Sequence, residues 1–465
     1  MNRLLAALLL LAFAPALRGE EPPKPLARIA FGSCADQDKP LPVFDTIAAT
    51  KPELLLLIGD NIYADLDRMR KVTPEVIKEK YDALGKLPGY QKLKAACPIM
   101  ATWDDHDLGK NDAGAEYPLK DESQKLFLDF FEAKPDDPRR TQKGVYTSAI
   151  YGPAGKRVQV LMLDTRYHRT APKKAPFDPK TRIAGYLPNT DPDATVLGAE
   201  QWKWLEGELK KPAEVRLLVS SIQVISEDHP FEKWANFPNE RAKLYSLLKS
   251  TGASGVVILS GDRHLAEISL DTKAVGYPLY DITSSGLNQG SKNWREPEAN
   301  RNRVAAMPYG DNFGMVLIDW SGDDPKLKLQ VRDEDGDTTC GVTVRGATLK
   351  AAAAVAVVPD PNLPAGVLSP AQAAAKVGEK VTVQYVVAST GGQANLYLNS
   401  TKDFRAKDNF AVVLTPKAKA GKWDKATGAT FNGKTIKATG TVVKSTGGSP
   451  QVDVTDPAQL EIVEK

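Results

Sequence analysis

The sequence predicts a layered α/β domain followed by a small all-β domain. Two observations support this fold class. From residue 27 onward, apolar strand-like runs alternate with amphipathic helical stretches, whereas beyond residue 366 only short alternating runs with polar turns remain. The first pattern is typical of a sheet covered by helices, and the second of a closed five-stranded β-barrel. A length of 465 residues also suits two or three compact units.

The amino terminus predicts export. Arg3 precedes an apolar stretch over residues 4–13, and small residues follow it up to Gly19. This pattern is typical of a Sec-type signal peptide, here residues 1–19, and it is too short to span a membrane. No other run approaches the roughly 20 apolar residues that a transmembrane helix needs. We therefore expect an exported protein, periplasmic or extracellular, without a transmembrane segment.

Export would leave at least one cysteine without a partner. The chain has three, Cys34, Cys97 and Cys340, and an odd number cannot all pair within one molecule in an oxidising compartment. At least one is therefore free, intermolecular or bound to a metal, and Cys34 is the candidate ligand. Pairing between Cys97 and Cys340 stays open.

The first domain, residues 20–350, carries six strand-like runs, at residues 27–34, 54–60, 97–105, 158–166, 215–225 and 256–264. Five aliphatic residues, Leu54 to Ile58, run without alternation, which indicates a strand covered on both faces, as in a parallel or mixed sheet under helices. Between strands, residues 197–211 predict a helix with Trp202, Leu205 and Leu209 on its buried face.

Four later runs in this domain are spaced more closely, at residues 266–270, 280–286, 313–320 and 327–333. Little helix separates them, and short connections are typical of antiparallel strands. We therefore expect these runs to form a second, antiparallel sheet.

Residues 351–366 consist largely of alanine, valine and proline, which predicts a linker. The domain beyond it, residues 367–465, has five strand-like runs, at residues 380–389, 395–400, 409–415, 435–445 and 451–463. The run LSPAQAAAKVGEKVTVQYVV carries most of a resemblance to OB-fold domains. Such domains bind oligonucleotides or oligosaccharides on one face.

Composition alone does not assign a partner to this last domain. It has 13 Lys and Arg against 8 Asp and Glu, a surplus of five, within a chain of net charge +3. Five aromatic residues lie among the lysines: Tyr397, Phe404, Phe410, Trp423 and Phe431. They suit either a weak contact with a polyanion or oligosaccharide, or the core that any barrel needs.

Side chains that can bind metal follow four predicted strands of the first domain. The motifs are FGSCAD with Cys34, IGDNIYAD with Asp60 and Tyr63, TWDDHD with Asp105, and SGDRH with Asp262 and His264. A thiolate, a phenolate, carboxylates and an imidazole together indicate a metal site. Asp60 is the candidate bridge, since one carboxylate can join two metals about 3.5 to 4 Å apart.

A purely structural reading of the same residues is also available. A lone Gly-Asp pair after a strand is usually a capped turn, and a lone buried cysteine commonly packs as a small hydrophobe. That reading requires four strand ends to carry uncompensated acids without cause, although like charges repel unless cations separate them.

The ordered motifs FGSC, IGDNIYAD, TWDDHD, LDTRYHR, SSIQVI and SGDRH resemble the PhoD-like alkaline phosphatases, a branch of the calcineurin-like metallophosphoesterases, over about residues 27 to 345. The resemblance implies a four-layer double β-sandwich flanked by helices, with two or more metals at the carboxyl edge of the strands. Most metallophosphoesterases have Asp and His in the first motif and two His in the last. Ser-Cys and Asp-Arg-His here agree with the PhoD branch.

Carried over position by position, the resemblance implies two kinds of metal site. An Fe(III) ion would be held by Cys34, Asp60, Tyr63 and His264, and a phenolate suits this hard ion. One or two Ca(II) ions would take Asp60, Asp105 and Asp262, since calcium prefers oxygen ligands. Other divalent metals are compatible with the same side chains.

The resemblance also implies an activity: hydrolysis of phosphate monoesters, and of diesters as a further option, by a metal-activated hydroxide. His106 would orient the phosphate or protonate the leaving oxygen, and the neighbouring Asp107 would fix its tautomer. Arg166 is a candidate phosphate clamp, with a salt bridge to Asp104 or Asp107 as the alternative. Asn111 is a comparable candidate for substrate binding, and Asp104 is expected to be a support.

Two other functions stay open at this stage. A secreted nucleotidase or phosphodiesterase would use the same metals on related small phosphate esters. A calcium-stabilised protein that binds an extracellular polymer without catalysis would use the α/β domain as a scaffold. The preferred ester and the oligomeric state are not determined by the sequence.

Overall fold

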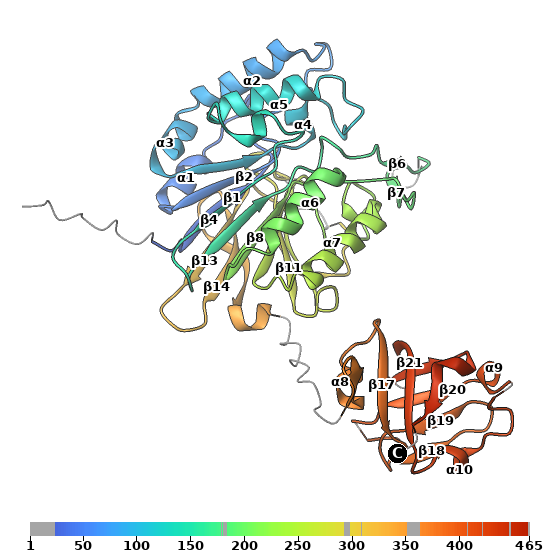
Figure 1. Cartoon of the computed structure of the whole chain (residues 1–465). Helices are drawn as coiled ribbons and strands as arrows, with labels where there is room; N and C mark the ends of the chain where they lie inside the picture. The colour runs from blue at the N-terminus through green and yellow to red at the C-terminus, as the bar shows by residue number, and fades with distance from the viewer. Residues whose placement is uncertain are drawn as a thin grey trace, which may run out of the picture. The chain divides into compact units, whose positions relative to one another are not determined.

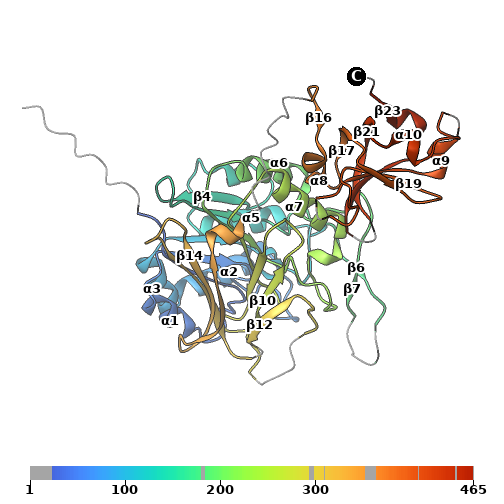
Figure 2. The same cartoon turned by 90° about the horizontal axis from the view of Figure 1, so that it is seen from below.

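The computed structural model describes residues 24–177, 179, 184–292, 298–307, 309–350, 363–406, 408–420, 422–445 and 448–463. The chain forms two compact units, Met1–Ala351 and Ala352–Lys465, each described below by itself (Figures 1 and 2). The predicted signal peptide, residues 1–19, and most of the predicted linker, residues 351–366, lie outside the described residues. Within the described ranges no helix is long and apolar enough to cross a membrane.

The first unit is built on two mixed sheets. The six-stranded sheet has the order β15 (Thr338–Arg345), β14 (Lys326–Asp333), β13 (Asn312–Asp319), β1 (Arg28–Gly32), β2 (Leu54–Ile58) and β3 (Ile99–Thr102). The seven-stranded sheet has the order β12 (Arg303–Met307), β10 (Ala266–Asp271), β11 (Leu279–Ser284), β9 (Val256–Ser260), β8 (Val215–Ser220), β5 (Val158–Met162) and β4 (Thr147–Tyr151). A hairpin pairs β6 (Lys173–Lys174) with β7 (Tyr186–Leu187).

Helices cover the outer faces of both sheets (Figure 1). Those against the six-stranded sheet are α1 (Val43–Ala49), α2 (Pro74–Lys86), α3 (Pro88–Ala96) and α5 (Lys120–Phe130), with the single-turn α4 (Asp105–Leu108) at the strand ends. Those against the seven-stranded sheet are α6 (Gly198–Leu209) and α7 (Pro238–Ser250). The result is the expected double β-sandwich between helices. In α6 the predicted residues Trp202, Leu205 and Leu209 are buried.

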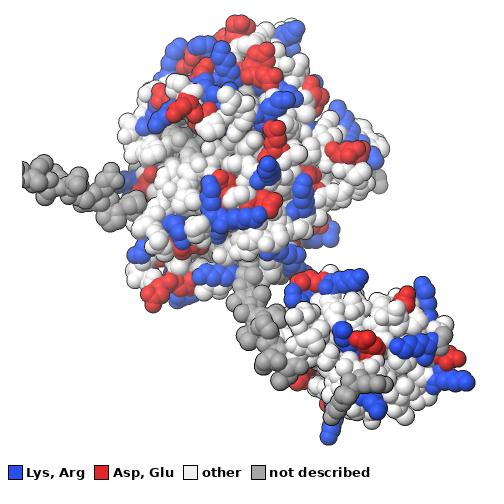
Figure 3. All heavy atoms as spheres, viewed as in Figure 1, with Lys and Arg blue, Asp and Glu red and all other residues white. Residues whose placement is uncertain are grey.

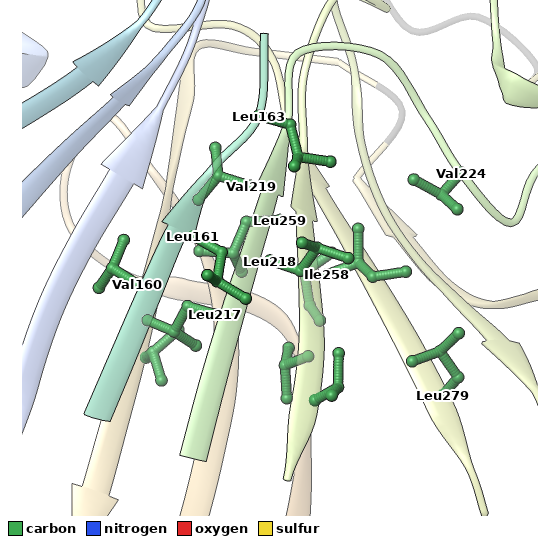
Figure 4. Packing of buried hydrophobic residues seen from close by; sticks show 14 of the residues in the cluster. Val160, Leu161, Leu163, Leu217, Leu218, Val219, Val224, Ile258, Leu259 and Leu279 are labelled. Atoms are coloured by element: carbon green, nitrogen blue, oxygen red, sulfur yellow. The ribbon is translucent and has the colours of Figure 1, made fainter. Parts of the chain in front are cut away.

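The strand β2 explains why its sequence does not alternate. All five of its residues are buried. Leu54, Leu56 and Ile58 enter the core between the two sheets, whereas Leu55 and Leu57 face the helices of the other core. Both faces of the strand are therefore removed from water, as the unbroken aliphatic run predicts. Figure 4 shows part of the same hydrophobic cluster, with residues of β5, β8 and β9 that lie on both faces of the seven-stranded sheet.

The division of strands between the sheets differs from the prediction of a separate antiparallel second sheet. β13 and β14 join the six-stranded sheet, where β13 lies antiparallel to β1. β10 and β11 join the seven-stranded sheet, where β11 is parallel to β9. Strand type is encoded locally, but the choice of pairing partner depends on contacts between residues far apart in the chain.

Gly314 on β13 lies opposite Phe31 on β1, and a Cβ atom at this glycine would be 2.1 Å from the Phe31 ring. We expect Gly314→Ala to lower the free energy of unfolding by about 1–3 kcal/mol, because the buried ring has to move in a packed core. Gly322→Ala is the matched control, since a Cβ there meets nothing within 4 Å. Equal denaturant midpoints for the two variants would contradict the prediction.

The second unit contains the five predicted strands, in β17 (Lys380–Val386), β19 (Leu396–Asn399), β20 (Ala411–Leu414), β21 (Thr435–Lys444) and β22 (Pro450–Val454). Short strands and helices supplement them: β16 (Val367–Leu368), β18 (Ser389–Gly391), β23 (Leu460–Ile462), α8 (Pro370–Ala374), α9 (Pro416–Lys419) and α10 (Gly428–Phe431). The last predicted run is split into β22 and β23, because a 3-10 turn begins at Pro457.

The strands of the second unit pair along one continuous path. Neighbouring strands follow the order β17, β21, β22, β20, β19 and β18, with β20 and β22 parallel. Only Val387 and Ala388 separate β17 from β18, so one nearly continuous strand pairs with β21 through its first half and with β19 through its second. The two ends of this order therefore lie on neighbouring segments of the chain, which is compatible with the expected barrel.

Candidate metal centre

The loops that follow four strands of the first unit meet at one edge of the sandwich. Cys34 follows β1, Asp60 follows β2 and Asp105 opens α4 just after β3, all from the six-stranded sheet. Asp262 and His264 follow β9 of the seven-stranded sheet. A bridge between Ser33 and Ser285, with the Ser33 amide donating to the Ser284 carbonyl at 3.2 Å, ties the two sheets together here.

Backbone strain is concentrated in these loops. Seven described non-glycine residues have positive φ, and five of them belong to this edge: Cys34, Asp60, Asp112, Asp262 and His264. Side chains at positive φ are strained and persist where the surrounding structure enforces them, which is common at functional sites. Gly59 must be glycine, since a Cβ at its φ of +119° would lie 2.7 Å from the Asp104 Cβ.

The side chains of the first group of candidate ligands, Cys34, Asp60, Tyr63 and His264, lie next to one another. The Asp60 Oδ2 atom lies 3.4 Å from the Cys34 Sγ atom and 3.3 Å from the Tyr63 hydroxyl. The same hydroxyl lies 3.0 Å from the His264 Nε2 atom. Thus the structure brings together the four residues that the sequence assigns to a single ion.

A second group extends from Asp60. Ligand atoms of Asp60, Asp105 and His106 lie within 4.8 Å of one another, as do those of Asp104, Asp105 and Asp262. Asp60 takes part in the first two groups, which is the position of a bridging carboxylate. Its Oδ1 atom is buried and has no hydrogen-bond partner in the described part of the chain.

The electrostatics of the centre favour a cation. Burial raises the pKa of Asp60 well above its usual value, and the neighbouring Cys34 raises it further. Burial likewise raises the pKa of Cys34, Tyr63 and Asp262. Without a cation the charged forms of these groups are therefore disfavoured, and a bound metal ion would reverse this preference by stabilising them. The donor set and the unpartnered Asp60 oxygen both fit a metal.

His106 has a different carboxylate partner from the predicted one. Its Nδ1 atom lies 2.5 Å from Asp65 Oδ1, and its ring packs on the Tyr63 ring at a centroid distance of 4.3 Å. Burial opposes the charged imidazole, but Asp105 and Asp65 together raise the pKa of His106 to about 10. The two carboxylates thus favour the charged form of the imidazole beside the centre.

Asp107 anchors the loop of Asp60 instead of contacting His106. Its oxygens accept hydrogen bonds from the Asn61 amide at 3.1 Å, the Asp104 amide at 2.9 Å and the Tyr81 hydroxyl at 3.0 Å. The prediction that Asp107 fixes the tautomer of His106 is therefore wrong. Consecutive residues of a helix point about 100° apart, so a neighbour in sequence is directed elsewhere.

Arg166 is held in an ion-pair network rather than facing the cavity. It is fully buried, its Nε atom donates to Asp104, and its Nη1 atom lies 2.6 Å from Glu232 Oε2. Arg169 pairs with the other oxygen of Glu232 at 2.5 Å. The structure thus contains the predicted salt bridge to Asp104, and Arg166 is not among the residues that line the neighbouring cavity.

The strand-end loops surround a cavity of about 430 Å³. The predicted residues Asp60, His106, Asn111, Asp262 and His264 line it. Asn111 belongs to the wall of the cavity, and its backbone N–H donates a hydrogen bond to Asp65 Oδ2 at 2.7 Å. We call this hollow the catalytic cavity.

Several functional residues have no signal in the sequence. Phe231 and Glu232, from the long loop after β8, line the catalytic cavity. Arg263 stacks on the Phe231 ring at 3.9 Å and lies 2.7 Å from Glu298. Asp65 and Arg263 are exceptions, because they belong to the IGDNIYAD and SGDRH motifs and could have been identified there. The three cysteines are free thiols, so Cys97 and Cys340 are not paired.

A helix-flanked double β-sandwich with a thiol, a phenol, an imidazole and carboxylates gathered at one edge defines a metallophosphoesterase-like protein. The chain belongs to the PhoD-like phosphatase family, whose model matches residues 29–319. The resemblance inferred from the motifs is thereby confirmed.

Two relatives give the extent of the similarity. Alkaline phosphatase D of Bacillus subtilis (strain 168) is 24% identical over 280 residues, which cover 52% of this chain and 46% of that protein. This chain thus spans about half the length of the curated relative. A solved structure of PhoD aligns with a TM-score of 0.52 at 17% identity, over 69% of this chain and 68% of that one, and supports the fold.

Proposed function

We propose that this protein hydrolyses phosphate esters, monoesters as well as diesters, at the candidate metal centre. One observation carries the proposal. In a chain of the PhoD-like phosphatase family, Cys34, Asp60, Tyr63 and His264 come from distant segments to share one point beside a cavity of about 430 Å³. Small phosphate esters are the substrates that this proposal implies.

In this proposal Cys34, Asp60, Tyr63 and His264 hold Fe(III), while Asp60, Asp105 and Asp262 hold Ca(II), as one or two ions. The phenolate suits the hard ferric ion, and carboxylate oxygens suit calcium. When bound, such metals supply Lewis-acid chemistry that activates water and neutralises charge on phosphoryl oxygens.

The protein's own side chains position the ester. Asp65 engages the Nδ1 atom of His106 at 2.5 Å, which leaves the other ring nitrogen to donate a hydrogen bond to the leaving oxygen. Asn111 is the proposed contact to a phosphoryl oxygen, since it lines the catalytic cavity. Asp107 and Arg166 act indirectly, by holding the loops that carry the candidate ligands.

The test combines metal analysis of the purified full chain with hydrolysis of paired monoester and diester substrates. We expect iron and calcium in the protein, and activity that chelators remove and added metal restores. Tyr63→Phe should bleach the visible absorption of an iron-bound phenolate. Diester preference, or preference for nucleotides, would identify a phosphodiesterase or nucleotidase. A colourless protein that binds calcium and hydrolyses none of these esters would overturn the proposal in favour of a polymer-binding protein.

Asp65→Asn is expected to lower kcat about 10²-fold, because the amide keeps the shape of the side chain but not the charge that holds His106. Metal content should stay at the wild-type level, which metal analysis of the same preparation checks. Asp67→Asn, an exposed neighbour in the same loop, is the matched control. An Asp65→Asn enzyme as fast as this control would contradict the role of Asp65.

We also propose that residues 1–19 direct export. The support is their sequence, in which Arg3 precedes an apolar stretch and small residues. Fractionation of expressing cells and determination of the mature amino terminus test this proposal. A full-length chain retained inside the cell would contradict it.

For the second unit we propose a weak contact with an oligosaccharide or polyanion. Tyr397 and Phe404 are 37% and 58% exposed and line a pocket of about 490 Å³ together with Lys402. In contrast, the aromatic residues Phe410, Trp423 and Phe431 belong to the core. Lys and Arg side chains are scattered over the visible face rather than gathered (Figure 3). Equal retention of wild type and Tyr397→Ala on immobilised oligosaccharide and on single-stranded DNA would contradict this contact.

A further inference from the structure

A second hollow lies beside the catalytic cavity. It has a volume of about 430 Å³. Its lining includes the apolar residues Val72, Pro74 and Leu119 and two cations, Lys71 and Lys110. We call it the apolar groove. Its size is within the range of pockets that hold small organic ligands.

The apolar groove and the catalytic cavity share a wall. Asp65 lines the groove, and its carboxylate contacts His106, which lines the cavity, at 2.5 Å. Lys110 lines the groove, and the next residue, Asn111, lines the cavity. The Asn111 amide donates to Asp65 Oδ2 at 2.7 Å, so one layer of residues separates the two hollows. The cavity and the groove are therefore neighbours, with Asp65, His106 and Asn111 between them.

The segment between two groove-lining residues, Asp65 and Lys71, carries exposed apolar side chains. Leu66 and Met69, in the segment from Asp65 to Lys71, are 49% and 95% exposed. No described carboxylate forms an ion pair with Lys71 or Lys110, so both cations are available to attract an anionic ligand.

We infer that the apolar groove holds an alkyl or aryl substituent of a phosphodiester whose phosphorus lies in the catalytic cavity. This inference rests on the proposed phosphoesterase function and specifies its substrate class, an amphiphilic phosphodiester. The phosphodiester anion is attracted by Lys71 and Lys110, and its apolar substituent leaves water on binding. Each methylene buried on a protein surface contributes about 0.8 kcal/mol, which corresponds to about a fourfold gain in affinity.

The test uses alkyl 4-nitrophenyl phosphates with methyl, butyl and octyl groups, which share the leaving group and differ only in the apolar substituent. With the metal-loaded full chain, kcat/KM should rise by about two- to fourfold for each methylene until the groove is filled. Two variants test the location. Val72→Thr adds a hydroxyl at nearly constant shape, and Lys71→Trp, at an exposed position, covers the groove without touching the core.

Both variants should lose most of the gain with chain length, and Val72→Thr should keep the wild-type rate on the methyl ester. Val386→Thr, an exposed valine of the second unit, is the matched control and should keep the gain. Hydrolysis of all three esters at equal kcat/KM, or an undiminished gain in both groove variants, would overturn the inference alone. Failure to hydrolyse even the methyl ester would overturn the proposed function, and the inference with it.

Discussion

Replacing Asp60 by asparagine is expected to lower ester hydrolysis about 10³-fold or more and to remove most of the bound metal. Asp60 belongs to two of the three groups of candidate ligands, so the loss of its charge affects more than one part of the centre at once. A bound metal supplies several kcal/mol of charge stabilisation, and each 1.36 kcal/mol corresponds to a tenfold change in rate. Steady-state kinetics and metal analysis of the same preparation measure both effects.

The same substitution should not destabilise the metal-free protein. Burial and the neighbouring Cys34 raise the pKa of Asp60, so its charge is unfavourable without a cation. We expect Asp60→Asn to have a Tm at or above that of metal-free wild type, and a lower Tm than wild type only when both are loaded with metal. Asp82→Asn, an exposed carboxylate on α2, serves as the control. An active, metal-replete Asp60→Asn protein would refute the bridging role.

The second large effect concerns stability. Arg166→Met is expected to lower the free energy of unfolding by about 3–5 kcal/mol, because it leaves buried carboxylates without their countercharge. Arg166 is fully buried and pairs with Asp104 and Glu232. Denaturant unfolding of the metal-free and the metal-loaded proteins measures the change.

A surface arginine provides the comparison for this experiment. Arg70 pairs with Glu79 at 2.7 Å, but both side chains are largely in solvent, so Arg70→Met should leave the denaturant midpoint almost unchanged. If Arg166→Met kept the wild-type midpoint and raised KM instead, Arg166 would act on the substrate, as a phosphate clamp does.

Most elements of the fold were predictable from local patterns. The unbroken run from Leu54 to Ile58 indicates a strand buried on both faces, and it is one. The strand ends carrying Cys34, Asp60 and His264 indicated where the centre would form. The assignment of β10, β11, β13 and β14 was not predictable, because pairing between strands depends on contacts across the whole domain.

The roles of charged residues near the centre were less predictable than their positions. Because Asp107 follows His106 directly, the sequence suggests that the two side chains are in contact. In α4 they point in different directions, so Asp107 contacts Asn61 and His106 contacts Asp65. For Arg166 the sequence is compatible with either a phosphate clamp or a salt bridge. The ion pair that it forms with the buried Glu232 could not be predicted, because Glu232 lies in a distant loop. Adjacency in sequence thus gave no guide to contact in these cases.

Local sequence was enough to indicate which residues can bind metal, which strands carry them at their ends, and the family to which the chain belongs. These properties are local, since they depend on side-chain chemistry and on hydrophobic periodicity. The three-dimensional arrangement was needed to show which carboxylate contacts His106, which carboxylates pair with the buried Arg166, and that an apolar groove adjoins the catalytic cavity. The direction and burial of a side chain arise from packing between segments far apart in the chain, so no single segment encodes them.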